Sequence, residues 1–148
     1  MRITFRGAAL TAVIMLSACA SPAPHGSNAA AASSPDLACM LPSNCVDSAG
    51  TGGFAPLSYQ GTPAQAMALL SATLKNFPEA TVVHSDALTM QVIFTTPMGF
   101  RDQVDFRVNS KDQRIDFRSR SLFGLFDWGK NRSRMQAFTM RFEQQARQ

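Results

Sequence analysis

Residues 104–118 read VDFRVNSKDQRIDFR, and this stretch decides the fold. Val104, Phe106 and Val108 alternate with charged residues, and the same alternation returns at Ile115 after a polar turn. A period of two places the apolar side chains on one face of a strand and the charged ones on the other. The stretch therefore predicts an antiparallel hairpin with one buried and one solvated face.

The charges of this hairpin select its register. If Asp105 pairs with Arg118, then Arg107 pairs with Asp116, and both pairs join opposite charges. A register shifted by two residues places Asp105 opposite Asp116, where like charges repel. Directly opposed pairs change stability by roughly 0.2–1 kcal/mol each, so we expect the first register, with 110–113 as the loop.

Further strands are expected on the N-terminal side of the hairpin. Residues 80–84 are rich in β-branched side chains, and 88–95 alternate between apolar and polar side chains. Turn sequences separate these segments from one another and from the hairpin. A short additional strand is possible within 54–59, in an otherwise glycine-rich region.

Two helices are predicted to flank these strands. Thr62-Pro63-Ala64-Gln65 has the pattern of a capping box with Pro at the first helical position, and Pro78 is expected to end that helix. A second helix near the C-terminus has Met135, Phe138 and Phe142 as its apolar stripe. The predicted fold class is α+β, an antiparallel β-meander of three to five strands flanked by an N-terminal and a C-terminal helix, with both helices on one sheet face.

Residues 1–18 predict a lipoprotein signal peptide. A basic start precedes the apolar stretch 7–16, which is too short for a permanent bilayer span. The stretch ends in LSAC at 16–19, which resembles the lipobox of bacterial lipoproteins. We therefore expect lipidation of Cys19, which would anchor the exported chain to a bacterial membrane on its periplasmic side. The alternative is an ordinary secretory signal in which Cys19 is incidental.

The segment that follows Cys19 is low in complexity. Residues 19–36 are predicted as the lipidated cysteine and a flexible tether, which reaches roughly 20–25 Å on average. By analogy with enteric sorting, Ala20 favours the outer membrane. Residues 37–148 are predicted as a single α+β domain.

Cys39 and Cys45 form an even pair in a chain that is expected to be exported. Such a pair predicts a disulfide. The alternative is a redox or metal pair, but the spacing is not that of a CxxC motif and no histidine lies near.

The composition excludes several classes of function. The net charge is +4, and removal of Arg2 and Arg6 with the signal leaves 12 basic against 10 acidic side chains. This small excess gives no reason to expect a nucleic-acid partner. With two His in 148 residues, no metal site, cofactor or serine triad is expected. The sequence does not decide whether the protein is an enzyme, and it favours a protein that is not one.

Residues 118–134 read RSRSLFGLFDWGKNRSR. This segment, which we call the signature, resembles that of the domain of unknown function 1499 family. An N-terminal element at 42–48 is similar to the family's as well. The resemblance implies an exported or membrane-associated α+β domain and no established activity. Gln103 stands where the family usually has a second Asp, so no acidic pair is available there. The matching residues of the signature are Arg118, Ser119, Ser121, Gly124, Asp127, Gly129, Asn131, Arg132 and Arg134.

The charged residues of the signature allow three interpretations. Arg118, Asp127, Asn131, Arg132 and Arg134 lie near the start of the second helix, where Asp127 or Asn131 is the expected N-cap. They can form a structural network, a site for an anion such as a phosphate, a carboxylate or a lipid headgroup, or a catalytic site.

The signature also contains Phe123, Leu125, Phe126 and Trp128. The first expectation is that they cover the end of the sheet, and the alternative is an exposed patch that touches lipid or a partner. Together, these features predict a lipid-anchored cell-envelope protein that binds or scaffolds without catalysis at the periplasmic face of a membrane. Its expected partners are the membrane, an anionic small molecule or headgroup, and an envelope protein. The alternative is an enzyme that acts on an anionic envelope substrate through the signature.

Overall fold

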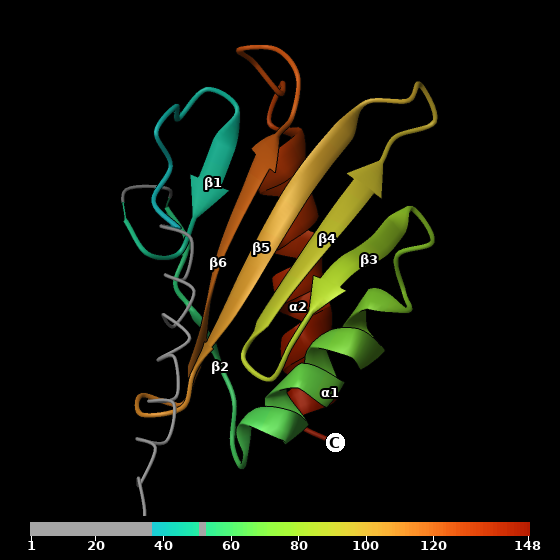
Figure 1. Cartoon of the computed structure of the whole chain (residues 1–148). Coiled ribbons are helices and arrows are strands. Elements are labelled where there is room, and N and C mark those ends of the chain that lie inside the picture. The colour runs from blue at the N-terminus through green and yellow to red at the C-terminus, as the bar shows by residue number, and fades with distance from the viewer. Residues whose placement is uncertain (1–36, 51–52) are drawn as a thin grey trace, which may run out of the picture. The chain divides into compact units, whose positions relative to one another are not determined.

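The computed structural model describes residues 37–50 and 53–148 (Figure 1). The predicted signal peptide, Cys19 and the tether lie outside the described residues. Within the described part the elements are β1 (Cys45–Asp47), β2 (Leu57–Ser58), α1 (Pro63–Leu74), β3 (Ala80–Ser85), β4 (Thr89–Thr95), β5 (Arg101–Asn109), β6 (Arg114–Ser121) and α2 (Lys130–Ala146).

The strands form one antiparallel sheet, and the predicted α+β class is confirmed. Its order is β1-β6-β5-β4-β3, and β2 also pairs with β6 (Figure 1). The meander is the run from β3 to β6. The short strands β1 and β2 add to its β6 side, which brings the sheet to six strands within the described residues.

The predicted register of the last hairpin is confirmed. Asp105 lies opposite Arg118, Arg107 lies opposite Asp116, and the loop is 110–113. The Arg118 Nη2 donates to Asp105 Oδ2 at 2.8 Å on the sheet face away from the helices. The opposed charges therefore make the contact that the sequence pattern favoured.

Asp105 has further partners on this face. Burial disfavours its charged form, but hydrogen bonds from Gln91, Arg118 and Gln103 outweigh that effect. The pKa of Asp105 therefore lies below its usual range.

The predicted disulfide joins Cys39 to Cys45. It closes the loop that leads into β1, and the first residue of that strand, Cys45, pairs with Arg120 of β6. The backbone N–H of Ser121 donates to the carbonyl of Asn44, which extends the contact beyond the strand. The bridge thus fixes an irregular segment against the sheet edge.

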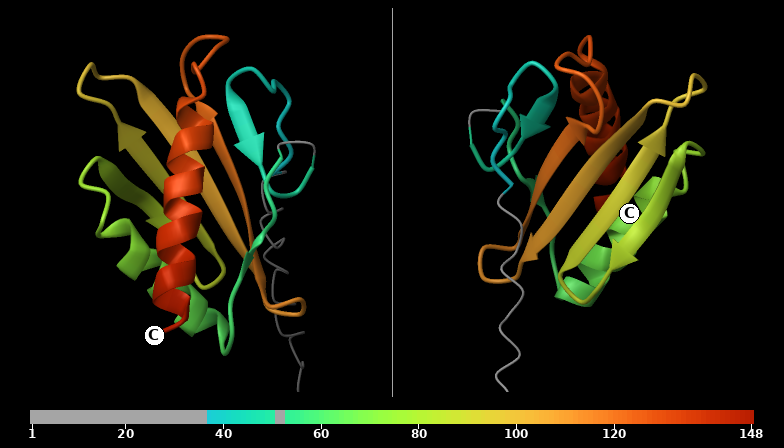
Figure 2. Two further views of the ribbon diagram at one scale, coloured as in Figure 1. Left: turned by 180° about the vertical axis from the view of Figure 1, so that it is seen from behind. Right: turned by 45° about the horizontal axis from the view of Figure 1, so that its top comes forward.

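Both helices pack on one face of the sheet, as predicted (Figure 2). The Thr62 side chain accepts from the backbone N–H of Gln65, and the Gln65 side chain accepts from that of Thr62, which completes the capping box. The helix α1 ends at Leu74, four residues before Pro78, because single turns bonded to Thr73 and Leu74 carry the chain onward.

The core lies between the helices and the sheet. The predicted stripe of α2, Met135, Phe138 and Phe142, is fully buried. The Phe138 ring lies 5.1 Å from that of Phe106, centroid to centroid. The apolar core runs along this face of the sheet toward the end where β5 begins and β6 ends. At that end, the buried side chains on the same face are polar.

Candidate functional site

The core face of the sheet becomes polar where β5 begins and β6 ends. Asp102 and Ser121 lie opposite each other there, and Ser119 is one further position along the same face. The first turns of α2 cover this end of the sheet with Asn131 and Arg134, both buried. We call Asp102, Ser119, Ser121, Asn131 and Arg134 the polar network.

A buried ion pair stands at the centre of the polar network. The Arg134 Nη2 donates to Asp102 Oδ2 at 2.7 Å, and each side chain is 5% exposed. The other carboxylate oxygen accepts from the Ser121 hydroxyl at 2.6 Å. The guanidinium also lies 4.7 Å from the ring centroid of Phe94. Both charges are thus satisfied inside the fold.

Asn131 connects three segments of the chain. Its Oδ1 accepts from the Ser119 hydroxyl at 2.6 Å and from Arg134 Nη1 at 3.1 Å. Its Nδ2 donates to the backbone carbonyl of Asn44 at 3.1 Å. The side chain therefore ties the disulfide loop, β6 and α2 together and has no exposed surface.

Asp127 caps the start of α2. Its carboxylate accepts from the backbone N–H of Gly129 at 2.9 Å and from that of Asn131 at 2.8 Å. The residue at the N-cap position is Gly129, in the left-handed region at φ 77°, so the prediction of Asp127 or Asn131 at that position was wrong. Asp127 lies two residues earlier and reaches the N–H groups from there. A negative side chain of the protein therefore already occupies the positive end of the helix, where the sequence suggested an external anion.

The remaining two arginines of the predicted set lie elsewhere. Arg118 points to Asp105 on the opposite face of the sheet. The Arg132 guanidinium lies 5.4 Å from the ring centroid of Phe54. The structure therefore brings Asp127, Asn131 and Arg134 together and places Arg118 and Arg132 apart from them.

The apolar residues of the signature do not cover the sheet, so the first expectation for them was wrong. Phe123 is 78% exposed and Trp128 is 96% exposed, and Leu125 and Phe126 are exposed as well. Beneath them, the buried polar network takes the place of the apolar core at this end of the sheet. A hydrogen bond from Asn44 Nδ2 to the carbonyl of Gly124, 2.8 Å long, positions the loop from one side.

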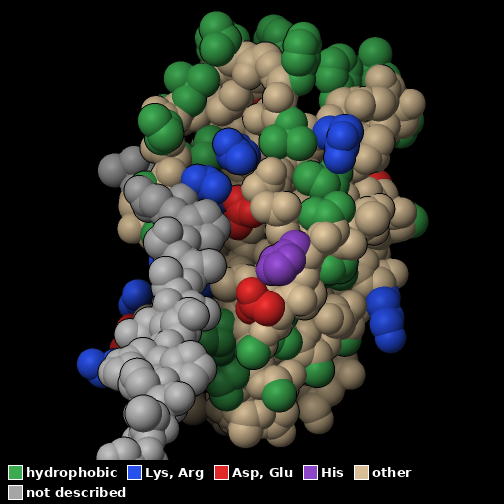
Figure 3. Space-filling model, viewed as in Figure 1, with side chains coloured by type: hydrophobic (Ala, Val, Ile, Leu, Met, Phe, Trp, Pro, Cys, Tyr) green, Lys and Arg blue, Asp and Glu red, His purple; other side chains and the backbone are tan. Residues whose placement is uncertain are grey.

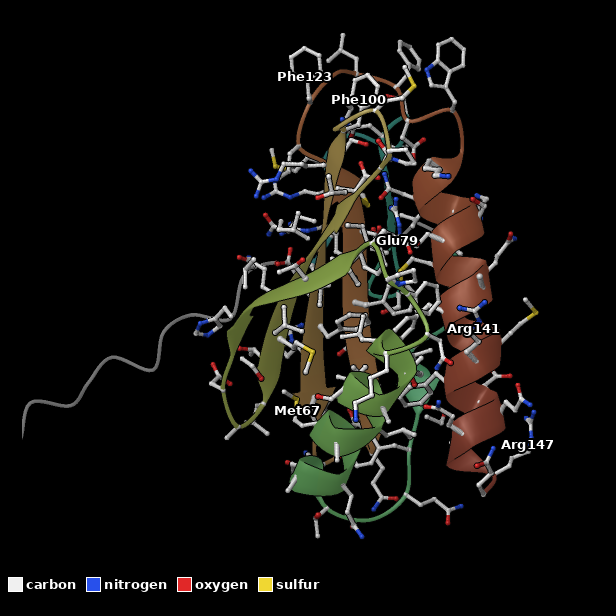
Figure 4. All side chains as sticks on the ribbon, turned by 90° about the vertical axis from the view of Figure 1, so that its right-hand side faces the viewer. Met67, Glu79, Phe100, Phe123, Arg141 and Arg147 are labelled. Carbon is white, nitrogen blue, oxygen red and sulfur yellow. A yellow bond between two sulfur atoms is a disulfide. The ribbon has the colours of Figure 1, made fainter. Side chains whose placement is uncertain are left out.

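A second segment contributes apolar side chains at the same end. Met98 and Phe100, in the turn between β4 and β5, are exposed. Figure 4 shows Phe100 and Phe123 close to one another at this end, and Figure 3 shows hydrophobic side chains gathered there. We call this surface the aromatic end, which comprises Met98, Phe100, Phe123, Leu125, Phe126 and Trp128.

A cavity of about 610 Å³ lies between the two segments of the aromatic end. Most of its lining is apolar, and Asp102, Ser121 and Asp127 also line it. Arg101 and Lys130 also line it, and both are exposed. No hydrogen bond or ion pair to another described residue engages either of these two side chains.

Sequence reasoning missed the contribution of the turn that contains Met98 and Phe100. The sequence did contain a signal for this surface, because the turn sequence 96–100 includes large apolar side chains that a turn usually exposes. Their closeness to the signature depends on β5 pairing with β6, which brings Asp102 opposite Ser121.

Other titratable groups give no second site. His84 is exposed and lies 3.3 Å from Asp86. Hydrogen bonds from the Thr89 side chain and from the Leu88 and Thr89 backbone hold the pKa of Asp86 well below its usual range. Across 37–50 and 53–148, no group of three or more His, Cys, Asp or Glu residues has the arrangement of a metal site.

The disulfide indicates an oxidising, exported compartment. Among the helices of the described residues, none has the length and apolar character to cross a bilayer.

No curated protein matches the chain. One protein family, described as "Protein of unknown function (DUF1499)", matches residues 17–142. This range contains the signature, the disulfide loop and all strands of the sheet, so the resemblance drawn from the signature is confirmed. The chain belongs to the DUF1499 family.

Proposed function

We propose that this chain is a lipid-anchored cell-envelope protein that acts as a non-catalytic binding module at the periplasmic face of a membrane. In this proposal, lipidated Cys19 supplies the anchor and residues 19–36 form the tether. The folded domain makes its working contact through the aromatic end, which touches the membrane surface.

The exposure of the aromatic end is the observation that carries this proposal. Single exposed apolar residues are ordinary, but a contiguous group of large ones marks a contact surface. Trp128 and three Phe side chains stand beside the cations Arg101 and Lys130. Aromatic rings with neighbouring basic side chains suit the boundary between headgroups and acyl chains.

The alternative is an enzyme that acts on an anionic envelope substrate. The geometry of the signature does not favour it. Such an enzyme needs groups that converge on a substrate. Arg134 is bonded to Asp102, Asp127 is bonded to backbone N–H groups, and Arg118 lies on the other sheet face. These charged residues make contacts that stabilise the fold. The aromatic end is therefore the surface that we propose for binding.

Trp128 is the single Trp of the chain, so its fluorescence reports directly on the aromatic end. The full-length lipidated protein would be reconstituted into vesicles that contain lipids brominated at shallow acyl positions. We expect bromolipids to quench Trp128 and aqueous iodide to lose access to it. Trp128 that remains open to iodide and unquenched by bromolipids would refute the membrane contact.

A matched pair of variants separates this contact from general surface effects. Phe123→Ser with Phe126→Ser should reduce bromolipid quenching at least twofold. Met140→Ser removes one exposed apolar side chain from α2, outside the aromatic end, and should leave the quenching unchanged.

The anchor needs its own test. Mass spectrometry of the mature protein should show acyl chains on Cys19 as its first residue. Cys19→Ser should remove that mass and lower the fraction of the protein that stays in the membrane pellet. An unmodified Cys19 would disprove the anchor and leave the membrane contact of the aromatic end open to the fluorescence test.

A further inference from the structure

We infer that the cavity at the aromatic end holds one single-chain anionic amphiphile, with its apolar chain inside and its charged head between Arg101 and Lys130. The inference rests on the proposed function, because a domain that contacts a membrane meets such molecules there. The proposed function is a contact of the aromatic end with the membrane surface. This inference adds a ligand that is bound inside the cavity.

The size and lining of the cavity argue for a bound molecule. Its volume of about 610 Å³ lies within the roughly 300–1,000 Å³ of small-molecule sites. Phe100 of the turn and Phe123, Phe126 and Trp128 of the loop supply most of the apolar lining. A protein that only rested on a bilayer would need protruding rings and no hollow between them.

The polar lining determines which end of an amphiphile enters. Asp102 is engaged by Arg134 and Ser121, and Asp127 is engaged by backbone N–H groups. Both carboxylates are already hydrogen-bonded within the protein, so the interior of the cavity offers no partner to a charged head. The head therefore stays at the mouth of the cavity, and the uncharged chain occupies the interior.

The charge at the mouth selects the sign of the head. Arg101, at the start of β5, and Lys130, at the start of α2, both line the cavity. Both are exposed, and neither side chain forms an ion pair with a described residue. An anionic head complements these two cations, whereas a cationic head meets two like charges.

The test uses the full-length chain with Cys19→Ser, so that neither its own acyl chains nor a detergent competes for the cavity. Trp128 fluorescence is followed during titration with dodecyl phosphate, dodecyl maltoside, dodecyltrimethylammonium and inorganic phosphate. Each amphiphile is kept below its critical micelle concentration. We expect a saturable one-to-one blue shift with dodecyl phosphate, weaker binding of the maltoside, and no binding of inorganic phosphate.

Chain length and charge are then varied separately. Decyl phosphate lacks two methylenes and should bind about tenfold more weakly than dodecyl phosphate. Arg101→Gln with Lys130→Gln should weaken dodecyl phosphate about three- to tenfold and leave the maltoside unchanged. Arg147→Gln is the matched control, because Arg147 is exposed at the far end of α2 (Figure 4).

Three outcomes would overturn the inference. The first is the absence of a saturable Trp128 shift with dodecyl phosphate, and the second is equal affinity for all three head groups. The third is a Trp128 shift that depends on protein concentration without any amphiphile, which would mean that a second copy of the chain fills the cavity. Bromolipid quenching without amphiphile binding would remove this inference and leave the proposed membrane contact. Amphiphile binding without bromolipid quenching would remove the proposed membrane contact and leave the bound amphiphile.

Discussion

The polar network and the aromatic end are neighbours along the chain and have opposite surroundings. Asn131 and Arg134 are polar, buried and hydrogen-bonded within the fold, whereas Phe126 and Trp128, only a few residues earlier, are apolar and exposed. This inverts the usual distribution of polar and apolar side chains. One region therefore contributes stability and the other remains free for binding, so mutations in the two should have opposite consequences.

The largest effect is expected from Arg134→Met. This change leaves the Asp102 carboxylate buried without its cation, and breaking such a pair costs about 3–5 kcal/mol of the free energy of unfolding. Urea denaturation followed by circular dichroism measures the loss.

A second variant tests the cause of that loss. Asp102→Leu with Arg134→Met removes both charges and should recover most of the stability. A double variant as unstable as Arg134→Met would show that the pair itself is not what matters, and would weaken the distinction between the two regions.

The sequence predicted part of this arrangement and could not predict the rest. The β5–β6 register followed from Asp105, Arg107, Asp116 and Arg118, because their signs alternate across one hairpin. Asp102 and Arg134 are 32 residues apart, and their contact depends on where α2 crosses the sheet. The partner of Arg134 therefore became identifiable only in three dimensions.

The strands β1 and β2 mark a second limit of the sequence pattern. They contain three and two residues, which is too few for an alternation to be recognised. The pairing of β1 with β6 is supported by the disulfide loop and by Asn44, whose carbonyl accepts from Ser121 and Asn131. The sequence did predict the Cys39–Cys45 bridge, because an even cysteine pair in an exported chain has few alternatives.

The next effect concerns the disulfide loop, which contacts both regions. Replacing Cys39 and Cys45 together by Ser should cost about 2 kcal/mol for a loop this short. Because Asn44 holds Gly124, the same variant should also loosen the aromatic end and raise backbone amide hydrogen exchange in residues 122–129. Unchanged exchange in these residues would mean that the disulfide loop supports the polar network alone.

A smaller effect is expected from Asp105, on the opposite sheet face. Its folded-state pKa is lowered, so its stabilisation is present above the unfolded pKa of about 3.9 and is lost as pH falls through the folded value. Asp105→Asn should cost about 1.5 kcal/mol at pH 7, and the gap to wild type should narrow below about pH 4.

Asp112 provides the control for this titration. It is about half exposed and its contact with Arg114 is 3.4 Å long, so Asp112→Asn should change stability by less than about 0.5 kcal/mol. A gap between Asp105→Asn and wild type that stays constant from pH 7 to pH 2 would rule out the proposed role of the charge.

The smallest change in stability, and the clearest contrast with Arg134, is expected at Trp128. Its φ of 55° is a left-handed conformation that costs an ordinary residue about 1–2 kcal/mol and that Asn tolerates. The side chain is 96% exposed, so almost no packing is lost on its removal. Trp128→Asn should leave the free energy of unfolding unchanged or raise it by up to about 1 kcal/mol, while vesicle cosedimentation of the Cys19→Ser chain decreases. Trp128→Phe should keep both the strain and the binding. A Trp128→Asn protein that is markedly less stable would show that Trp128 packs on the domain in solution, and the aromatic end would then belong with the polar network.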